Sequence, residues 1–465
     1  MTGKISRRNF LRGAVLASAG LAAAACQPAQ PSGPAATQAP QGSPSQPKKE
    51  VKITWMVWGG VERYKVHTDN WARLYPETNA WLKVENVSPG SGEADSYKAL
   101  RLALAAGGEG LPDICAFNYN GIPEFARGGH LLVLDNYMTK YQADLVERAK
   151  AVGQYEGKFI GVVNQLKPKV WFYRKDLFDK AGINPDTIKT WDELMAAANK
   201  FKEANPGSFM FNMGLKPAGY YYNEMLSHWD DSQFSDKSGN YTFQNNPNYK
   251  SVFQWLKQMG TTGISYNTDD FSTDWGPAFA DNKIGSSLIA AWMTGFLPKY
   301  APKQKGLWKL TLWPEFNRYG TDNGGQVTCV MKGSKNPDAA FEFISKMWLE
   351  AKGALAYWEA IGSPTCIKSG QEAIKAAAMK AERPAGMSDE NWAVAPVNFF
   401  GGDFMDVVNK ATDYVKVFPW SPKGTAEMSI LQQHHQAYME GKETLEESLN
   451  KAAADMKQQI GNPYA

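Results

Sequence analysis

Apolar and polar positions alternate over residues 51–57, a segment rich in Val, Ile and Trp, which predicts a β-strand at the start of the folded body. Gly59 and Gly60 interrupt the alternation, and an amphipathic stretch follows that stops at Pro76. Because glycine pairs and proline terminate regular elements, the stretch between them predicts one helix. The chain therefore opens with a strand and a helix.

A second helix and a second strand follow. Tyr97, Leu100 and Leu104 fall on one helical face within residues 95–106, and the apolar residues 113–117 predict a short buried strand. A strand, a helix and a strand at this spacing predict parallel pairing and the α/β class. Further helices are predicted over residues 190–204, where Thr190 and Glu193 form a capping box, and over residues 336–348 and 445–460.

Composition and charge narrow the class of protein. The 465 residues are 43% hydrophobic and 21% charged, which excludes disorder and indicates two or three folding units. Residues 1–25 contain four basic groups and no acid, so the remainder holds 46 basic groups against 47 acidic ones. Because nucleic-acid-binding proteins need excess positive charge, a nearly neutral body argues against nucleic-acid binding. Beyond Cys26 the sequence has three cysteines, an odd number outside any CxxC, which predicts buried small hydrophobes: Cys115, Cys329 and Cys366.

The N-terminus resembles a twin-arginine export signal. Arg7 and Arg8 lie in a basic stretch, and the apolar run 13–25 follows it. That run has 13 residues, whereas about 20 are needed to cross a bilayer core. Residues 1–25 are therefore predicted to be an export signal, and the protein is predicted to act outside the cytoplasm.

Cys26 follows the apolar run and resembles the lipidated cysteine of a lipoprotein cleavage box, although Ala23 stands where that box usually has Leu. The alternative is ordinary cleavage at the Ala-x-Ala formed by Ala23 and Ala25. Residues 26–50 contain six prolines and almost no large apolar side chains, which predicts an extended tether. Because this tether directly follows Cys26, lipidation is favoured over ordinary cleavage, and the protein is predicted to be lipid-anchored on the outer face of the cytoplasmic membrane.

Several stretches of the body match, in order, runs that are typical of one family. They are residues 104–107 with 111–114 ("alaaG..PD"), 127–135 ("..G.L..LD"), 155–161 with 170–182 ("dGk.yg" and "yYnkdlf.kaG"), 190–194 ("TWdEl"), 278–283 with Trp292, and 324–326 with 334–340. Together they make the chain from residue 51 onward resemble the extracellular solute-binding proteins of ABC sugar importers, the family of maltose-binding protein.

The resemblance implies an α/β, two-lobe periplasmic-binding-protein-like fold with hinge strands and a ligand cleft between the lobes. The implied crossings lie near residues 162–164, 285–287 and 328–331. The implied lobes are residues 51–163 with 287–330, and residues 164–286 with 331–465. A hinge between lobes suits ligand capture, because closure removes a small solute from water.

The resemblance also implies the function. The expected protein is a monomeric substrate-binding lipoprotein that captures a sugar or oligosaccharide by lobe closure and delivers it to the membrane subunits of an ABC permease. No cofactor, metal or catalytic residue is expected. Departures from the family pattern fall where ligand would lie: Val163 replaces a usual proline, and Asn164, Gln165 and Lys167 fill the loop that follows. Sugar identity and chain length therefore stay open.

All 16 tryptophans lie beyond residue 50, and sugars favour aromatic plates with polar side chains around them. Trp58 ends the first strand, where ligands of α/β sheets bind. The family pattern adds Trp292, just past a hinge strand, and the loop after the second strand. The predicted ligand contacts are Trp58, Phe117, Asn118, Tyr119, Asn120, Asn164, Tyr221, Tyr222, Trp229, Trp275, Trp292, Trp313, Trp358 and Trp420.

Two other functions stay open from the sequence. A secreted carbohydrate-active enzyme would share the aromatic groove and needs only two carboxylates, for which Asp95, Glu124 and Asp274 are available. The local motifs of P-loop, dinucleotide-binding, α/β-hydrolase and zincin chemistry do not occur. The third possibility is the same two-lobe fold with a peptide or another small solute as its ligand.

Overall fold

The computed structural model describes residues 49–90, 92–215, 217, 219–320, 325–380, 383 and 388–465. Arg7, Arg8, Cys26 and nearly all of the predicted tether lie outside the described residues. Among the described helices, none combines the length and the apolarity needed to cross a bilayer.

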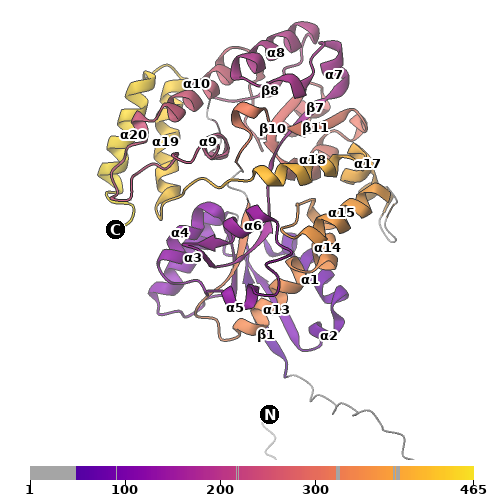
Figure 1. Cartoon of the computed structure of the whole chain (residues 1–465), viewed down its shortest axis with the longest axis vertical. Coiled ribbons are helices and arrows are strands. Elements are labelled where there is room, and N and C mark those ends of the chain that lie inside the picture. The colour runs from indigo at the N-terminus through magenta and orange to yellow at the C-terminus, as the bar shows by residue number, and fades with distance from the viewer. Residues whose placement is uncertain are drawn as a thin grey trace, which may run out of the picture. The chain divides into compact units, whose positions relative to one another are not determined.

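A five-stranded sheet organises the first lobe (Figure 1). Its strands β1 and β2 pair in parallel, as do β1 and β3, while β12 is antiparallel to both β3 and β6. The strands, in spatial order, are β2 (Leu82–Val87), β1 (Val51–Met56), β3 (Ile114–Asn118), β12 (Gln326–Val330) and β6 (Val162–Gln165). The strands predicted over residues 51–57 and 113–117 are confirmed as β1 and β3, and so is their parallel pairing.

Helices from distant parts of the sequence cover this sheet. α13 packs against β1, β6 and β12, and α1 packs against α14. The helices of this lobe are α1 (Val61–Leu74), α2 (Pro76–Asn79), α3 (Glu93–Ala105), α4 (Ile122–Arg127), α5 (Asp135–Met138), α6 (Glu147–Val152), α13 (Pro337–Trp348) and α14 (Ala351–Ile361), with the hairpin β4 (Gln154–Tyr155) and β5 (Lys158–Phe159).

A three-stranded antiparallel sheet organises the second lobe, with β7 (Lys169–Arg174) between β10 (Ser286–Ala290) and β11 (Trp308–Leu312). A two-stranded sheet joins β8 (Phe211–Asn212) to β9 (Ser265–Tyr266). The remaining helices are α7 (Lys175–Lys180), α8 (Trp191–Ala204), α9 (Gly219–Leu226), α10 (Pro247–Thr261), α11 (Trp275–Ala280), α12 (Leu297–Tyr300), α15 (Lys368–Lys380), α16 (Asp389–Ala393), α17 (Pro396–Phe400), α18 (Phe404–Ala411), α19 (Gly424–Met439) and α20 (Leu445–Gln459).

Local capping chemistry explains two of the predicted helices. At the start of α8, Thr190 Oγ1 accepts a hydrogen bond from the Glu193 amide, and the Glu193 carboxylate accepts one from the Thr190 amide. Thr444 and Glu447 do the same at the start of α20. Each box satisfies backbone donors that a helix start leaves without partners.

The crossings between lobes differ from the predicted ones. The chain enters the second lobe between β6 and β7, near the first predicted crossing, but the crossing predicted at residues 285–287 is wrong. From Ser286 onward β10 pairs with β7, so residues 286–312 belong with the second sheet and not with the first lobe. Residues 337–361 likewise pack on the first lobe. A fully buried strand such as β10 does not reveal from its composition which sheet it joins.

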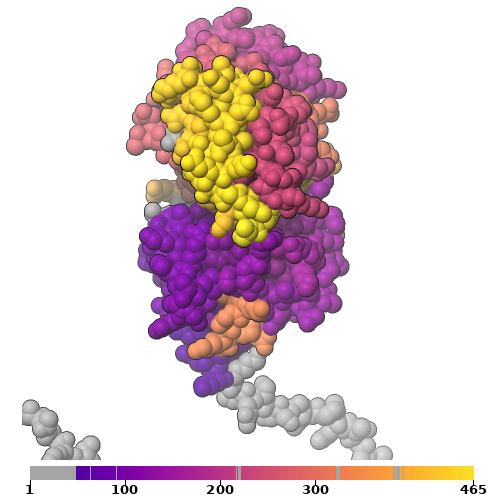
Figure 2. Space-filling view, turned by 90° about the vertical axis from the view of Figure 1, so that its left-hand side faces the viewer, coloured from indigo at the N-terminus to yellow at the C-terminus, as the bar shows by residue number. Residues whose placement is uncertain are grey.

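The C-terminal helices connect the two lobes on one side. In Figure 2 they are yellow, lie over the second lobe and reach the first lobe, where α19 lies beside the short helix η1 (Tyr119–Gly121). Near the chain end, Arg127 Nη2 of α4 donates to the Tyr464 carbonyl at 2.6 Å. The first lobe thus contacts the second both through the hinge and through these helices.

The three cysteines are free and buried, as predicted. Burial raises the pKa of each thiol, so each behaves as a small apolar side chain.

A substitution at Gly161, just before β6, tests how tightly the chain packs against β12 at this point. A Cβ there would lie 2.5 Å from Val327 Cγ1 and 2.9 Å from the Thr328 carbonyl, both on β12. We expect Gly161→Ala to lower the free energy of unfolding by about 1 to 3 kcal/mol in denaturant titrations. The control is Gly333→Ala, where the added Cβ would approach only Leu111, at 3.4 Å. Equal stability of the two variants would contradict the close packing.

Candidate functional site

The ends of the strands bring polar residues to one edge of the first sheet. β2, β1, β3 and β6 are parallel and β12 is antiparallel, so four C-terminal ends and one N-terminal end share that edge. Trp58, residues 118–120, residues 164–165 and Gln326 lie there. Strand-end edges are where α/β folds bind ligands.

The second sheet presents the matching edge. β7 begins at Lys169, four residues after Gln165, so the end of β6 and the start of β7 are adjacent. Ala290 at the end of β10 pairs with Lys169, and Trp292 follows. The two edges are therefore joined by residues 166–168 and face one region between the lobes.

A β-bulge in β6 directs two amides to the same partners. Gln326 pairs with Gln165 and Val327 pairs with Val163, so Asn164 is the extra residue of the bulge. A bulge re-aims a side chain in this way and is common beside functional sites. Asn164 Nδ2 and Gln165 Nε2 both donate to Gln326 Oε1, at 3.2 and 3.0 Å.

Tyr357 of α14 completes this buried amide network. Its hydroxyl accepts hydrogen bonds from Gln165 Nε2 at 3.0 Å and Asn164 Nδ2 at 3.4 Å. His67 of α1 packs against the Tyr357 ring at 4.5 Å between centroids. Asn164 Oδ1 accepts no hydrogen bond from any residue that the structure describes. An acceptor of this kind can receive a hydrogen bond from a ligand hydroxyl.

A carboxylate at the start of α3 lies next to the loop after β3. Glu93 accepts hydrogen bonds from Asn118 Nδ2 and from Asn120 Nδ2, the latter at 3.3 Å. Burial raises the pKa of Glu93, while these amides and the charge of Lys167 lower it. The predicted Asn118 and Asn120 are thus brought together at the edge, whereas Glu93 was missed by the sequence analysis.

Lys169 is a buried cation at the edge of the second sheet. Its Nζ donates to the Glu224 carbonyl at 2.9 Å and to the Asn317 carbonyl at 2.6 Å. It also lies 4.1 Å from the centroid of Trp313. Burial lowers the pKa of Lys169 well below its ordinary value, and Glu224 acts in the opposite direction. Trp313, predicted as a ligand contact, is buried beneath the Lys169 amino group.

Trp292 lies directly after β10, which is a strand of the second sheet and not the hinge strand that the sequence analysis expected before it. It is 9% exposed, and the Phe271 ring stacks on it with centroids 5.3 Å apart and planes inclined by 24°. Phe296 meets it edge-on at 5.4 Å. One face of the indole is therefore already covered by an aromatic ring of the same lobe.

Carboxylates lie beside this aromatic pair. Asp270 accepts a hydrogen bond from Asn212 Nδ2 at 2.7 Å, and burial raises the pKa of Asp270 to about 7. Tyr221 of α9 is buried, which raises its pKa, and the charges of Glu224 and Asp269 raise it further. Aromatic rings and carboxylates thus lie close enough in this part of the second lobe to interact electrostatically.

Several predicted contacts have side chains that pack in the core. Phe117 stacks on Tyr97, Tyr222 hydrogen-bonds to His435, and Trp275 packs against Tyr300. Phe117, Tyr222 and Trp275 have no exposed surface. Besides Trp292, Trp313, Asn120 and Asn164, the other predicted contacts with buried side chains are Trp58, Tyr119, Tyr221, Trp358 and Trp420.

Two of these buried residues still lie at the edge. Tyr119 Oη donates to the Gln165 carbonyl at 3.0 Å. Trp358 belongs to the same apolar cluster as Trp292, while its neighbour Tyr357 belongs to the larger cluster. α14 therefore contributes to the amide network and to the packing around Trp292.

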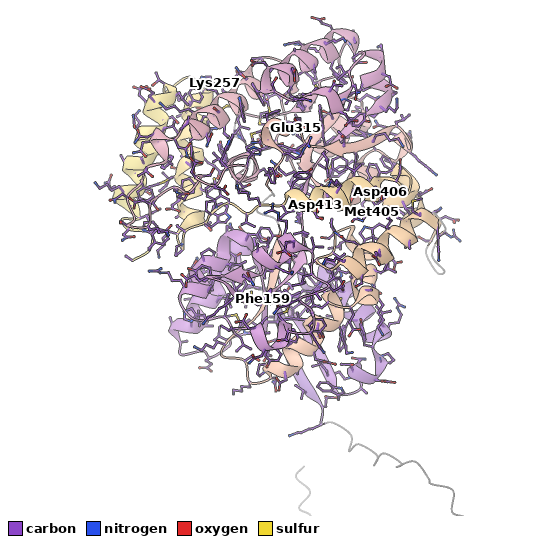
Figure 3. All side chains as sticks on the ribbon, viewed as in Figure 1. Phe159, Lys257, Glu315, Met405, Asp406 and Asp413 are labelled. Atoms are coloured by element: carbon purple, nitrogen blue, oxygen red, sulfur yellow. The ribbon has the colours of Figure 1, made fainter. Side chains whose placement is uncertain are left out.

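A cavity of about 510 Å³ lies between the lobes and contains the predicted Trp229. Arg148 comes from α6 of the first lobe, and its Nε donates to the Asp413 carbonyl at 3.1 Å; Asp413 is labelled in Figure 3. Burial, with the charges of Lys169 and Lys416, lowers the pKa of His228 to about 4. The lining residues are Arg148, His228, Trp229, Asp230, Asp231, Tyr319 and Lys416.

The described residues contain no group of three or more His, Cys, Asp or Glu side chains that could hold a metal ion. The strand-end edges instead carry amides, aromatic rings and isolated carboxylates. The model of the bacterial extracellular solute-binding protein family matches residues 75–385, which is more than half of the chain. The chain belongs to this family. The family assignment agrees with the predicted resemblance.

Relatives in sequence are binding proteins. The chain is 27% identical over 323 residues to the arabinooligosaccharide-binding protein of Bacillus subtilis, covering 67% of this chain and 72% of the relative. It is 23% identical over 276 residues to the protein of the same name from Halalkalibacterium halodurans, covering 57% of this chain and 60% of that relative. These family members are similar to this chain over much of its body.

Solved structures confirm the two-lobe fold. A binding protein from Bifidobacterium animalis subsp. lactis in complex with β-1,6-galactobiose is 23% identical with a TM-score of 0.68, and covers 89% of this chain and 99% of its own. The sugar-binding protein MalE from Xanthomonas citri is 16% identical with a TM-score of 0.70, and covers 89% of this chain and 97% of its own. At these identities the likeness establishes the fold alone.

The raised pKa of Asp270 predicts a pH-dependent stability. The folded protein holds a proton on Asp270 up to about pH 7, whereas an ordinary aspartate releases it near 3.8. Stability should therefore fall as the pH rises through this window. We expect Asp270→Asn to flatten the decline of melting temperature between about pH 4 and 7.

Asp281→Asn, at an exposed carboxylate after α11, is the matched control and should keep the wild-type slope. Glu427 has a pKa that burial also raises to about 7, so some slope remains in Asp270→Asn. Identical slopes in wild type and Asp270→Asn would show that Asp270 is ionised throughout.

Proposed function

We propose that this protein is the substrate-binding lipoprotein of an ABC transporter, which captures a sugar or oligosaccharide between its lobes and delivers it to the membrane permease. The observation that carries the proposal is the pairing of an amide-rich strand edge with an aromatic one. Two relatives are named as arabinooligosaccharide-binding proteins, and one structural neighbour was solved with β-1,6-galactobiose.

The edge chemistry suits a neutral polyol. Asn118 and Asn120 each keep a buried amide oxygen that accepts no hydrogen bond from any described residue, as does Asn164. Amides both donate and accept, which matches hydroxyl groups. Aromatic rings on the facing edge match the C–H face of a sugar ring. The ionisable groups at these edges, Glu93 and Lys169, already have hydrogen-bond partners within the protein, so a neutral ligand fits better than an ionic one.

The hinge supplies the transport signal. A ligand that contacts both edges favours the closed form by its differential affinity for that form. The permease then distinguishes loaded from empty protein by shape. The protein acts as a monomer on the outer face of the cytoplasmic membrane, held by lipidated Cys26 and the tether of residues 26–50.

A sugar panel tests this function. Arabinotriose, maltotriose, β-1,6-galactobiose and lacto-N-biose are added separately, and melting temperature and the radius of gyration are measured. We expect at least one sugar to raise the melting temperature and to compact the protein. Stabilisation at 100 times the dissociation constant should be about 2.7 kcal/mol. A sugar that binds without lowering the radius of gyration of the protein would contradict closure of the two lobes around the ligand.

The same mixtures separate a binding protein from an enzyme. Sugars recovered after prolonged incubation should be unchanged in chain length. Hydrolysis products that scale with protein concentration would support a carbohydrate-active enzyme instead.

The anchor has its own test. We expect Cys26→Ala to move the exported protein from the membrane to the soluble fraction, because the thiol that carries the lipid is removed. Cys366→Ala is the matched control, since Cys366 is buried in the body and should not affect localisation. Membrane association that persists in Cys26→Ala would contradict lipidation.

A further inference from the structure

Phe271 combines a left-handed backbone conformation with an exposed aromatic side chain, and both are unusual for a phenylalanine. Its backbone φ is 62°, a left-handed conformation found among the described non-glycine residues only at Glu156, Phe271 and Asn282. Its side chain is 57% exposed, which places it among the few exposed large hydrophobic residues. It is the single described residue that has both properties. A bulky residue with positive φ is strained, and such strain clusters at functional sites.

The sequence around Phe271 gives no packing reason for an aromatic residue. Residues 267–274 are Asn-Thr-Asp-Asp-Phe-Ser-Thr-Asp, so Phe271 is the one apolar residue in a polar loop. This loop lies between β9 and α11. A lone aromatic residue in a loop held by a rigid scaffold is more typical of binding than of core formation.

The ring of Phe271 is nevertheless fixed in place. It stacks on Trp292, packs on Trp275 with centroids 5.0 Å apart, and meets Phe296 edge-on at 6.1 Å. Trp275 is fully buried and Trp292 nearly so. Three aromatic rings therefore support Phe271 from behind, and much of its own surface remains in water.

We propose that the exposed face of Phe271 is the sugar platform of this protein, and that Trp292 is the ring that supports it. This inference rests on the proposed function and relocates the platform from the residue that the family pattern indicates. Because Phe271 occupies one face of Trp292, a sugar stacked on this side of the second lobe meets the phenyl ring first.

The neighbours of Phe271 define the class of ligand. Asp269 is exposed and Asp270 is partly buried, and both precede Phe271 directly in the loop. A loop that carries an exposed aromatic ring next to acidic residues suits a neutral sugar ring, whose C–H face stacks on the phenyl ring while its hydroxyls donate to carboxylate oxygens. An acidic sugar would meet the like charge of the exposed Asp269 in the same loop. The platform therefore selects neutral sugar units.

The test compares four variants by calorimetry with each sugar of the panel that the wild type binds. Phe271→Ala should weaken binding at least tenfold, while Phe271→Tyr should stay within threefold because the aromatic face is kept. Leu102→Ala removes another exposed apolar side chain, on α3, and Glu156→Gly relieves another strained backbone position. Both controls should bind like the wild type.

Melting curves of the unliganded variants complete the test. Phe271 is exposed, so Phe271→Ala should melt within a few degrees of the wild type, which separates lost binding from lost folding. Affinity of Phe271→Ala within threefold of the wild type would overturn the proposal. Tighter binding would also overturn it and assign the platform to the uncovered Trp292. A wild type that binds no sugar of the panel would instead contradict the proposed function itself.

Discussion

The insertion of β12 between β3 and β6 is the constraint on which the arrangement of the two lobes depends. β12 runs against both neighbours, so its first residue, Gln326, lies at the edge where β3 and β6 end. That single residue meets both amides of the bulge. Without the antiparallel return, the chain coming from the second lobe would enter the sheet at its opposite edge.

Local sequence signals predicted the helices well because their causes are local. The capping boxes of α8 and α20 fix helix starts through side chains three residues apart. The loop with Asn118 and Asn120 was found at the end of a strand that its own composition identifies, whereas Trp292 was proposed from the family pattern. These predictions needed no knowledge of which strand pairs with which.

The features that the sequence did not predict depend on which strands pair and which side chains are buried, and neither can be read from residue type. β10 is buried at every position, so its pattern is compatible with either sheet. The bulge at Asn164 arises from the register against β12, some 160 residues away. Residue type alone also could not separate Trp275, which is fully buried, from an aromatic ring at the surface. Glu93 and Phe271 were missed because neither matches a family motif.

Two polar networks lie on either side of the connection between β6 and β7, one in each lobe. Asn164, Gln165, Gln326 and Tyr357 bond to one another within the first lobe. Lys169 bonds to Glu224 and Asn317 within the second lobe.

Each network holds one end of the connection at residues 166–168, and neither network crosses it. The Pro168 carbonyl accepts a hydrogen bond from the Ala291 amide at 2.8 Å, which fixes that residue to the second lobe. Leu166 and Lys167 lie between these two ends, and the chain also passes between the two sheets from β11 to β12. Since Lys167 also acts electrostatically on Glu93, a change in its backbone would be felt directly at the amide-rich edge.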